Sequence, residues 1–247
     1  MNITKNQIDD LNATIKIELG KEDYAGRVEK ALKDYQKKVV VNGFRPGKTP
    51  MGIVKKMYGK SLLVDEINKV LGESLNNYIK ENNLQPVHLL VTHGHLDHNF
   101  GNNTIHETFG LKPEVSAADE SLMKNLKQQA EVFYQMQLDY DFPPVGHFFE
   151  EDEVIRFGNH QFEIILTPGH SRGSVTFYCA DEKVAFTGDT LFRGSIGRTD
   201  FKGGSMFQII NSLRFLAQLP DDVKVLPGHG QATSIGEELA HNPYMDR

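Results

Sequence analysis

The sequence predicts a mixed α/β (α+β) protein built from two unlike parts, and three observations lead to that class. Apolar residues recur at helical spacing in residues 22–41 and again in residues 63–79. Farther along, the pattern changes to short apolar runs, each followed by a loop rich in glycine, histidine or aspartate. Helical spacing returns in residues 117–138 and 204–219. We therefore expect a helix-rich α+β domain at 1–84 and a sheet-based domain at 85–247.

The N-terminal part begins with a predicted strand, ATIKIEL, followed by a basic amphipathic helix over residues 22–41. The segment GFRPGKTP then predicts a turn, because its prolines resist helix and its glycines permit tight backbone. This turn presents Arg45 and Lys48 on an exposed tip. A second helix is expected to begin at Pro50, and a third over residues 63–79.

This order of elements resembles the ribosome-binding domain of trigger factor, a bacterial chaperone. The resemblance rests on the early strand, the basic helix, the GFRPGK loop and the helices after it. In that family the loop contacts the ribosome, which implies ribosome-binding roles for Phe44, Arg45 and Lys48. The family's further strands and its substrate-binding and isomerase regions have no counterpart in this chain.

Charge and composition limit the partners and the cellular location that we expect for this protein. Residues 1–60 hold 13 Lys/Arg against 7 Asp/Glu, and the rest of the chain holds 14 against 26. This asymmetry indicates either a basic surface for an anionic partner or a solvated basic helix face. With no long apolar run and no signal-peptide layout at the start, we expect a cytoplasmic protein without a membrane span. The acidic C-terminal half, without a basic or aromatic tract, argues against direct DNA binding.

The C-terminal part places potential metal ligands directly after predicted strands. The segment HLLVTHGHLDH holds His93, His95, Asp97 and His98 within six residues. Three further potential ligands follow in glycine-containing turns: His170 in TPGHS, Asp189 in TGDT and His229 in PGHG. Because Cys179 is the only cysteine, a metal site here must be built from His, Asp and Glu. Such a dense HxHxDH cluster predicts a site for two metal ions.

These motifs and their order resemble the metallo-β-lactamase superfamily from Thr92 to Gly230. That resemblance implies a four-layer αββα sandwich, here lacking its usual N-terminal strands because residues 1–84 occupy their place. It also implies how two zinc ions would be held, with iron or manganese as alternatives. The first ion would be bound by His93, His95 and His170, the second by Asp97, His98 and His229, with Asp189 bridging both.

The stretch LFRGSIGRTDF looks most like the glyoxalase II-like branch, whose members act on acylated thiols such as hydroxyacylglutathione. A metal-bridging hydroxide would attack the thioester carbonyl, with Asp97 and Asp189 as the catalytic carboxylates. A thiolate leaves with little acid help, since its conjugate acid has a pKa near roughly 8.5. Arg198 either orders its loop with Asp200 or contacts an anionic substrate. Persulfide dioxygenases share a GRTDF-like element, but PGHG and FRGS argue against that branch.

Two resemblances in one chain indicate a chimera of a trigger-factor-like segment and a hydrolase. The main prediction is a thioesterase. The alternatives are a ribosome-associated binding protein with an inactive hydrolase half and, ranked lower, a nucleic-acid-processing member of the same superfamily. The remaining histidines fit no ligand spacing and are expected to be structural or exposed: His88, His106, His147, His160 and His241.

Overall fold

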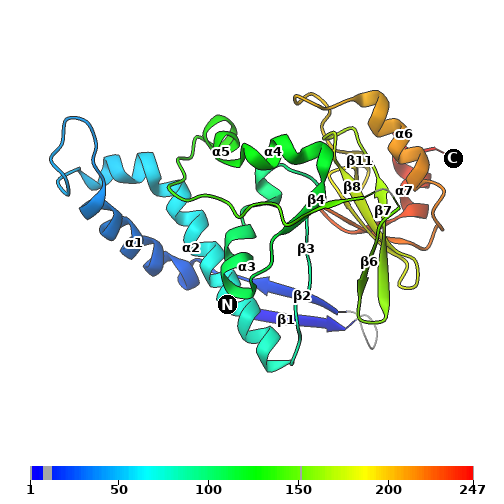
Figure 1. Cartoon of the computed structure of the whole chain (residues 1–247), viewed down its shortest axis with the longest axis horizontal. Coiled ribbons are helices and arrows are strands. Elements are labelled where there is room, and N and C mark those ends of the chain that lie inside the picture. Colours follow the sequence, from blue (N-terminus) through cyan, green and yellow to red (C-terminus); the bar gives the residue numbers. More distant parts are fainter. Residues whose placement is uncertain (1, 8–12, 151, 247) are drawn as a thin grey trace. The chain divides into compact units, whose positions relative to one another are not determined.

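The computed structural model describes residues 2–7, 13–150 and 152–246, and it divides into two compact units. One unit comprises residues 1–86, 103–110 and 127–141, and the other comprises residues 87–102, 111–126 and 142–247. The predicted mixed α/β class is confirmed by the helices and sheets of both units (Figure 1). Among the described residues, no helix is long and apolar enough to cross a membrane.

In the first unit, β1 (Asn2–Gln7) and β2 (Ala13–Glu18) pair only with each other, as an antiparallel hairpin. The predicted strand ATIKIEL corresponds to β2, whereas β1 was not predicted. The basic amphipathic helix is confirmed as α1 (Lys21–Lys38). The two helices predicted after Pro50 are a single helix, α2 (Met51–Glu81), because no proline interrupts the stretch. The prediction of a break there was wrong.

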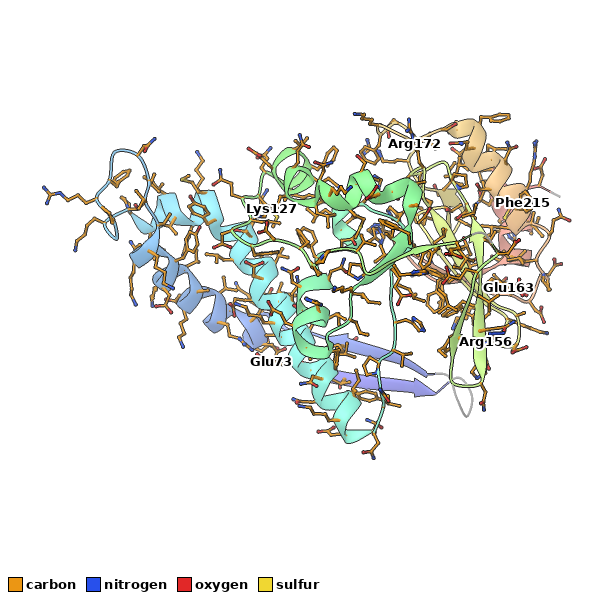
Figure 2. The ribbon with its side chains drawn as sticks, in the orientation of Figure 1. Glu73, Lys127, Arg156, Glu163, Arg172 and Phe215 are labelled. Carbon is orange, nitrogen blue, oxygen red and sulfur yellow. The ribbon has the colours of Figure 1, made fainter. Side chains whose placement is uncertain are left out.

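Helices α1 and α2 pack as an antiparallel hairpin around a small apolar core of Leu32, Val39 and Val54 (Figure 1). The guanidinium of Arg27 on α1 adds two hydrogen bonds, of 2.6 and 2.8 Å, to the carboxylate of Glu73 on α2, which is labelled in Figure 2. Helix α2 ends where Asn83 adopts a left-handed backbone, with φ of 52°. The unit also contains most of α3 (Asn102–Phe109) and α5 (Leu126–Tyr134).

The second unit contains two sheets. A six-stranded sheet has the order β13-β12-β9-β8-β7-β6, and a three-stranded parallel sheet has the order β3-β4-β5. The strands of the larger sheet are β6 (Val154–Phe157), β7 (His160–Leu166), β8 (Val175–Cys179), β9 (Val184–Gly188), β12 (Lys224–Pro227) and β13 (Thr233–Ser234). The smaller sheet comprises β3 (Leu89–Leu90), β4 (Pro113–Ser116) and β5 (His147–Phe149). The four predicted strands are confirmed as β3, β7, β9 and β12.

Two apolar clusters cover opposite faces of the larger sheet. Because side chains alternate along a strand, Phe177 and Tyr178 of β8 point to different faces. Tyr178 joins the cluster with α6 (Met206–Leu216) and α7 (Ile235–His241), and Phe177 joins the cluster that reaches β3 and β5. The outer side of α6 stays exposed, as the labelled Phe215 shows (Figure 2). The unit is therefore layered as helices, larger sheet and smaller sheet.

Two helical predictions had different outcomes. The stretch 204–219 is confirmed as α6. The stretch 117–138 is not one helix: it is broken into a 3-10 turn (Ala117–Asp119), α4 (Glu120–Lys124) and α5, and it ends at Tyr134. Near-helical spacing could not reveal these breaks, because side-chain periodicity is similar across a short kink. A further antiparallel pair, β10 (Leu191–Phe192) and β11 (Ser195–Ile196), follows β9.

Candidate metal centre

Parallel pairing of β9 and β12 brings two predicted ligands to one edge of the larger sheet. The pairing is regular up to Leu226, which pairs with Phe186, and after a shift of register Pro227 pairs with Gly188. Asp189 follows β9 directly and His229 follows β12 after Gly228, so the parallel pairing places both at the same edge. The Gly228 N–H donates to the Gly188 carbonyl at 2.8 Å, which extends the ladder to the site.

The HxHxDH segment leaves β3 and turns at once. Its last residues form a 3-10 turn (Leu96–His98), and Asn99 then donates from Nδ2 to the carbonyls of His93 and His95 at 3.2 and 2.6 Å. The Val175 N–H of β8 donates to the Thr92 carbonyl at 2.9 Å, which ties this loop to the larger sheet. These hydrogen bonds fix the backbone of the turn that carries four of the predicted ligands.

All seven predicted ligands come together in two groups. The first is His93, His95 and His170, and the second is Asp97, His98, Asp189 and His229; within each group the candidate ligand atoms all lie within 4.8 Å of one another. Asp189 Oδ2 lies 3.5 Å from Nε2 of both His170 and His229, so one carboxylate oxygen reaches both groups. We call these seven residues the metal centre.

Buried polar atoms of the metal centre fit a bound cation. His93 Nε2, His98 Nε2 and Asp189 Oδ1 are buried without a hydrogen-bond partner among the described residues. Leaving such atoms unpaired costs free energy, and buried polar groups in proteins are nearly always satisfied. Two metal ions would accept these lone pairs, one ion at the group of His93 and the other at the group of His98 and Asp189. Imidazole nitrogen and carboxylate oxygen are ligands that zinc and iron both accept.

Hydrogen bonds on the far side of the rings orient the histidines. Nδ1 of His170 donates to the Arg198 carbonyl at 2.7 Å, which leaves Nε2 as the ring nitrogen with a free lone pair. Nε2 of this ring lies 2.8 Å from Nδ1 of His95, and a proton on His95 Nδ1 makes this a hydrogen bond that Nε2 of His170 accepts. A metal ion bound by both nitrogens would take the place of that proton.

Burial and neighbouring charges set the pKa values of these groups. Burial, followed by the adjacent imidazoles, puts the pKa of His93 well below its usual value, and burial also lowers the pKa of His95. Burial alone would raise the pKa of the Asp189 carboxyl, but the neighbouring His98 outweighs it and the pKa is lowered. Burial would lower the pKa of His98, but Asp189 outweighs it and the pKa is raised. Metal binding requires neutral imidazoles and an ionised carboxylate, which the shifts of His93, His95 and Asp189 favour.

Asp119 supports the centre, and the sequence analysis missed it. Its buried carboxylate accepts hydrogen bonds from the N–H groups of Gly94 at 2.9 Å and Gly173 at 2.8 Å, and from Ser171 Oγ at 2.6 Å. It thereby joins the loop of His93 and His95 to the loop of His170. Asp119 lies in the stretch predicted as helix, and only its position at the end of the apolar run PEVSAA could have pointed to it.

Close packing explains why residue 228, next to the metal ligand candidate His229, is a glycine. A Cβ atom at Gly228 would overlap Asp189 Oδ1 and lie 2.7 Å from His98 Cε1. Glycine is therefore required between β12 and His229 for Asp189 and His98 to approach each other. The glycines of the PGHG motif were read from sequence only as permitting close backbone approach.

The predicted substrate-binding and ribosome-binding residues lie outside this cluster. Arg198 forms two hydrogen bonds with Asp200, of 2.9 and 2.7 Å, and its guanidinium lies 4.4 Å from the centroid of the Phe201 ring. This is the loop-ordering role considered for Arg198, and its contact with a substrate stays a prediction. Phe44, Arg45 and Lys48 lie exposed on the loop between α1 and α2, in the other unit.

Comparison with known proteins identifies the family. The metallo-beta-lactamase superfamily model matches residues 65–229, a range that starts inside α2, and the predicted boundary at residue 85 stays a prediction. The chain is 40% identical to the hydroxyacylglutathione hydrolase GloC of Haemophilus influenzae over 176 residues, covering 70% of this chain and 82% of that protein.

Two solved structures are similar to this chain in both fold and sequence. The BLEG-1 B3 metallo-beta-lactamase has a TM-score of 0.63 at 31% identity, and TTHA1623, in a di-iron-bound form, has a TM-score of 0.62 at 32% identity. Each alignment covers 70% of this chain and 84% of the other. The similarity confirms the predicted fold, and the chain belongs to the metallo-beta-lactamase superfamily, as a metal-dependent hydrolase.

Proposed function

We propose that this chain is a thioesterase with two zinc ions, acting on an acylated thiol of the hydroxyacylglutathione type. The observation that supports it most directly is the sharing of Asp189 Oδ2 between the two ligand groups, at 3.5 Å from both His170 and His229. Similarity to the GloC hydroxyacylglutathione hydrolase supports the substrate class. The related di-iron-bound structure makes iron the alternative metal.

The chain's own residues suit hydrolysis of an activated acyl group. Bound metal ions would acidify a water and polarise the substrate carbonyl. Asp97 Oδ2 lies 3.2 Å from His229 Nε2, and both side chains are partly exposed, so Asp97 is placed to accept a hydrogen bond from the attacking water and orient it. No serine or cysteine is needed as nucleophile. A thiolate leaving group needs little protonation, which favours a thioester over an amide.

The test combines metal content with turnover. Purified, dialysed wild-type protein, Asp189→Ala and the surface control His241→Ala would be compared by elemental mass spectrometry and by hydrolysis of S-lactoylglutathione. We expect about two zinc ions per chain and turnover in the wild type and the control, and loss of both in Asp189→Ala. If the wild type contains two iron ions and hydrolyses the substrate, the proposed metal is wrong and the proposed thioesterase activity stands. A wild type that binds metal but does not hydrolyse the thioester would refute the proposed substrate class.

A second candidate function concerns the first unit. The loop between α1 and α2 exposes Phe44, Arg45 and Lys48 together, and Gln36 Nε2 holds its end through a 2.6 Å hydrogen bond to the Thr49 carbonyl. An exposed aromatic ring beside two cations suits a phosphate-rich surface. These features support docking to the ribosome, the alternative predicted from sequence.

Ribosome docking is tested by co-sedimentation at low and high salt. The double variant Arg45→Ala with Lys48→Ala is expected to abolish binding, whereas Lys55→Ala with Lys56→Ala, which removes two exposed cations from α2, is expected to retain it. Equal binding by both variants would contradict a specific loop contact. Equal loss would also contradict it, since unspecific charge attraction would then explain the result.

A further inference from the structure

An open cavity of about 390 Å³ lies beside the metal centre on the His229 side. It is lined by Phe192, Arg193, His229, Gly230 and Gln231. Its size falls within the range of small-molecule sites, roughly 300–1,000 Å³. His229 is a candidate metal ligand, so the cavity adjoins the centre. A substrate whose carbonyl reaches the metals therefore has room for its remainder here.

The cavity contains a cation, Arg193, that no acid among the described residues neutralises. Arg193 is exposed, and within the part of the chain that the structure describes, no carboxylate forms an ion pair with it. Its Nη1 donates to Gln231 Oε1 at 2.8 Å, and the neutral amide orients the guanidinium without cancelling its charge. Arg198, the cation predicted from sequence, differs because Asp200 already binds it through two hydrogen bonds.

The residues that line the cavity beside Arg193 provide both an apolar and a polar surface. The Phe192 ring lies 6.1 Å from the His229 ring, edge to face, and provides an apolar surface beside this candidate ligand. Gln231 adds an amide that can both donate and accept hydrogen bonds. The lining therefore suits a carrier with a nonpolar thiol arm near the metals and an anionic group farther out.

We propose that Arg193, held by Gln231, is the residue that recognises an anionic group on the thiol carrier. This inference rests on the proposed thioesterase function and extends it, since it names the feature of the carrier that is selected. The anion is a carboxylate or a phosphate, because a guanidinium pairs with either in the same forked geometry. Arg193 is a specificity residue in this account and takes no part in the reaction at the carbonyl.

Three thioesters separate the possibilities in a kinetic test: S-lactoylglutathione with carboxylates, lactoyl-coenzyme A with phosphates, and the neutral lactoyl thioester of N-acetylcysteamine. The measured quantity is the ratio of kcat/KM for each anionic substrate to that for the neutral one. Arg193→Gln is expected to lower this ratio about tenfold for the preferred carrier, mainly through KM. The carrier with the larger ratio in the wild type identifies the anion.

Two further variants test whether Arg193, rather than another arginine, recognises the anionic group. Arg214→Gln removes an exposed arginine of α6 and is expected to leave the ratio unchanged. Arg198→Gln tests the competing residue. If Arg198→Gln lowers the ratio and Arg193→Gln does not, the proposal is overturned. An unchanged ratio in Arg193→Gln, or an equal fall in Arg193→Gln and Arg214→Gln, also overturns it.

A binding measurement separates this inference from the thioesterase proposal. Calorimetric titration of metal-loaded wild type and Arg193→Gln with S-methylglutathione and S-methyl-coenzyme A needs no turnover. Binding of either probe that weakens about tenfold in Arg193→Gln supports the anionic subsite, even if no thioester is hydrolysed and the substrate class fails. Absence of binding, or equal affinity in both proteins, contradicts the subsite whatever the catalytic result.

Discussion

The carboxylate of Asp119 accepts a hydrogen bond from the backbone N–H of Gly94 at 2.9 Å, and so holds the turn between His93 and His95. The same carboxylate accepts from Ser171 Oγ and the Gly173 N–H, beside His170. A single buried acid thus joins two ligand loops that lie about 75 residues apart in sequence. Outer partners of this kind tune metal affinity although they do not contact the ion.

Replacing Asp119 with Asn should weaken the metal centre. The amide puts an NH₂ group where a carboxylate oxygen accepts hydrogen bonds, so at least one buried donor loses its partner, at a cost of about 1–3 kcal/mol in unfolding free energy. Metal affinity should fall roughly 10- to 100-fold. Competition with a zinc chelator measures the affinity. Asp181→Asn, an exposed acid, is the control, and equal affinity in both variants would contradict the supporting role.

Replacing Gly228 with Ala should disrupt the centre through packing alone. The added methyl group overlaps Asp189 Oδ1, so either Asp189 or the end of β12 must move. A shift of about 1 Å at a catalytic site is enough to reduce turnover around 100-fold. Gly101→Ala adds the same methyl group where no atom lies within 4 Å, and it should retain metal content and activity. Full metal content and activity in Gly228→Ala would show that the site tolerates the overlap.

Metal removal should destabilise the folded protein. Without the ion, His93 Nε2 stays buried with no hydrogen-bond partner among the described residues, and His98 Nε2 and Asp189 Oδ1 have only their 3.3 Å contact with each other. An ion that binds only the folded state adds about 2.7 kcal/mol when present at 100 times its Kd. For a chain of this size, that corresponds to a fall in Tm of roughly 5–10 °C on chelation. Thermal unfolding with chelator, followed by zinc re-addition, measures it. The Tm of Asp189→Ala should change little on chelation. A fall in Tm as large as that of the wild type would contradict the assignment of Asp189 as a metal ligand.

Asp65 should make the first unit less stable as the pH rises. Burial raises the pKa of Asp65 to about 6 from 3.8, opposed by its hydrogen bond with Tyr140. A raised folded-state pKa means that the stabilising contribution is complete below about pH 4 and is lost as the pH rises through about 6. Asn cannot ionise. Above about pH 6, the free energy of unfolding of Asp65→Asn should therefore exceed that of the wild type by about 1–2 kcal/mol, after allowance for solvent screening.

Urea unfolding followed by far-ultraviolet circular dichroism at low and high pH measures the effect of Asp65→Asn. The control Asp34→Asn removes an exposed carboxylate whose pKa is lowered by its hydrogen bond to Lys37, and it should give no gain at high pH. A pH-independent difference between Asp65→Asn and the wild type would show that ionisation of Asp65 is not the cause.

Local patterns were sufficient for the ligand types and most of the elements near them. The apolar runs before His93, Asp189 and His229 predicted strands that the structure contains, because a strand's alternation and its terminating loop are properties of a few adjacent residues. The position of Pro50 likewise predicted the start of α2. Its uninterrupted length to residue 81 was not predicted, because the apolar stripe over residues 63–79 was assigned to a separate helix although no proline interrupts the stretch.

The sequence by itself determined which residues could bind metal, the mixed α/β class and the family resemblance. Only the tertiary structure decided how those residues meet: parallel pairing of β9 and β12 places Asp189 beside His229, and Asp119 connects loops that are distant in sequence. It also distinguished Arg198, neutralised by Asp200, from Arg193, which faces a cavity without an acid partner among the described residues. These distinctions depend on long-range contacts, and residue spacing along a chain does not specify which distant groups share a surface.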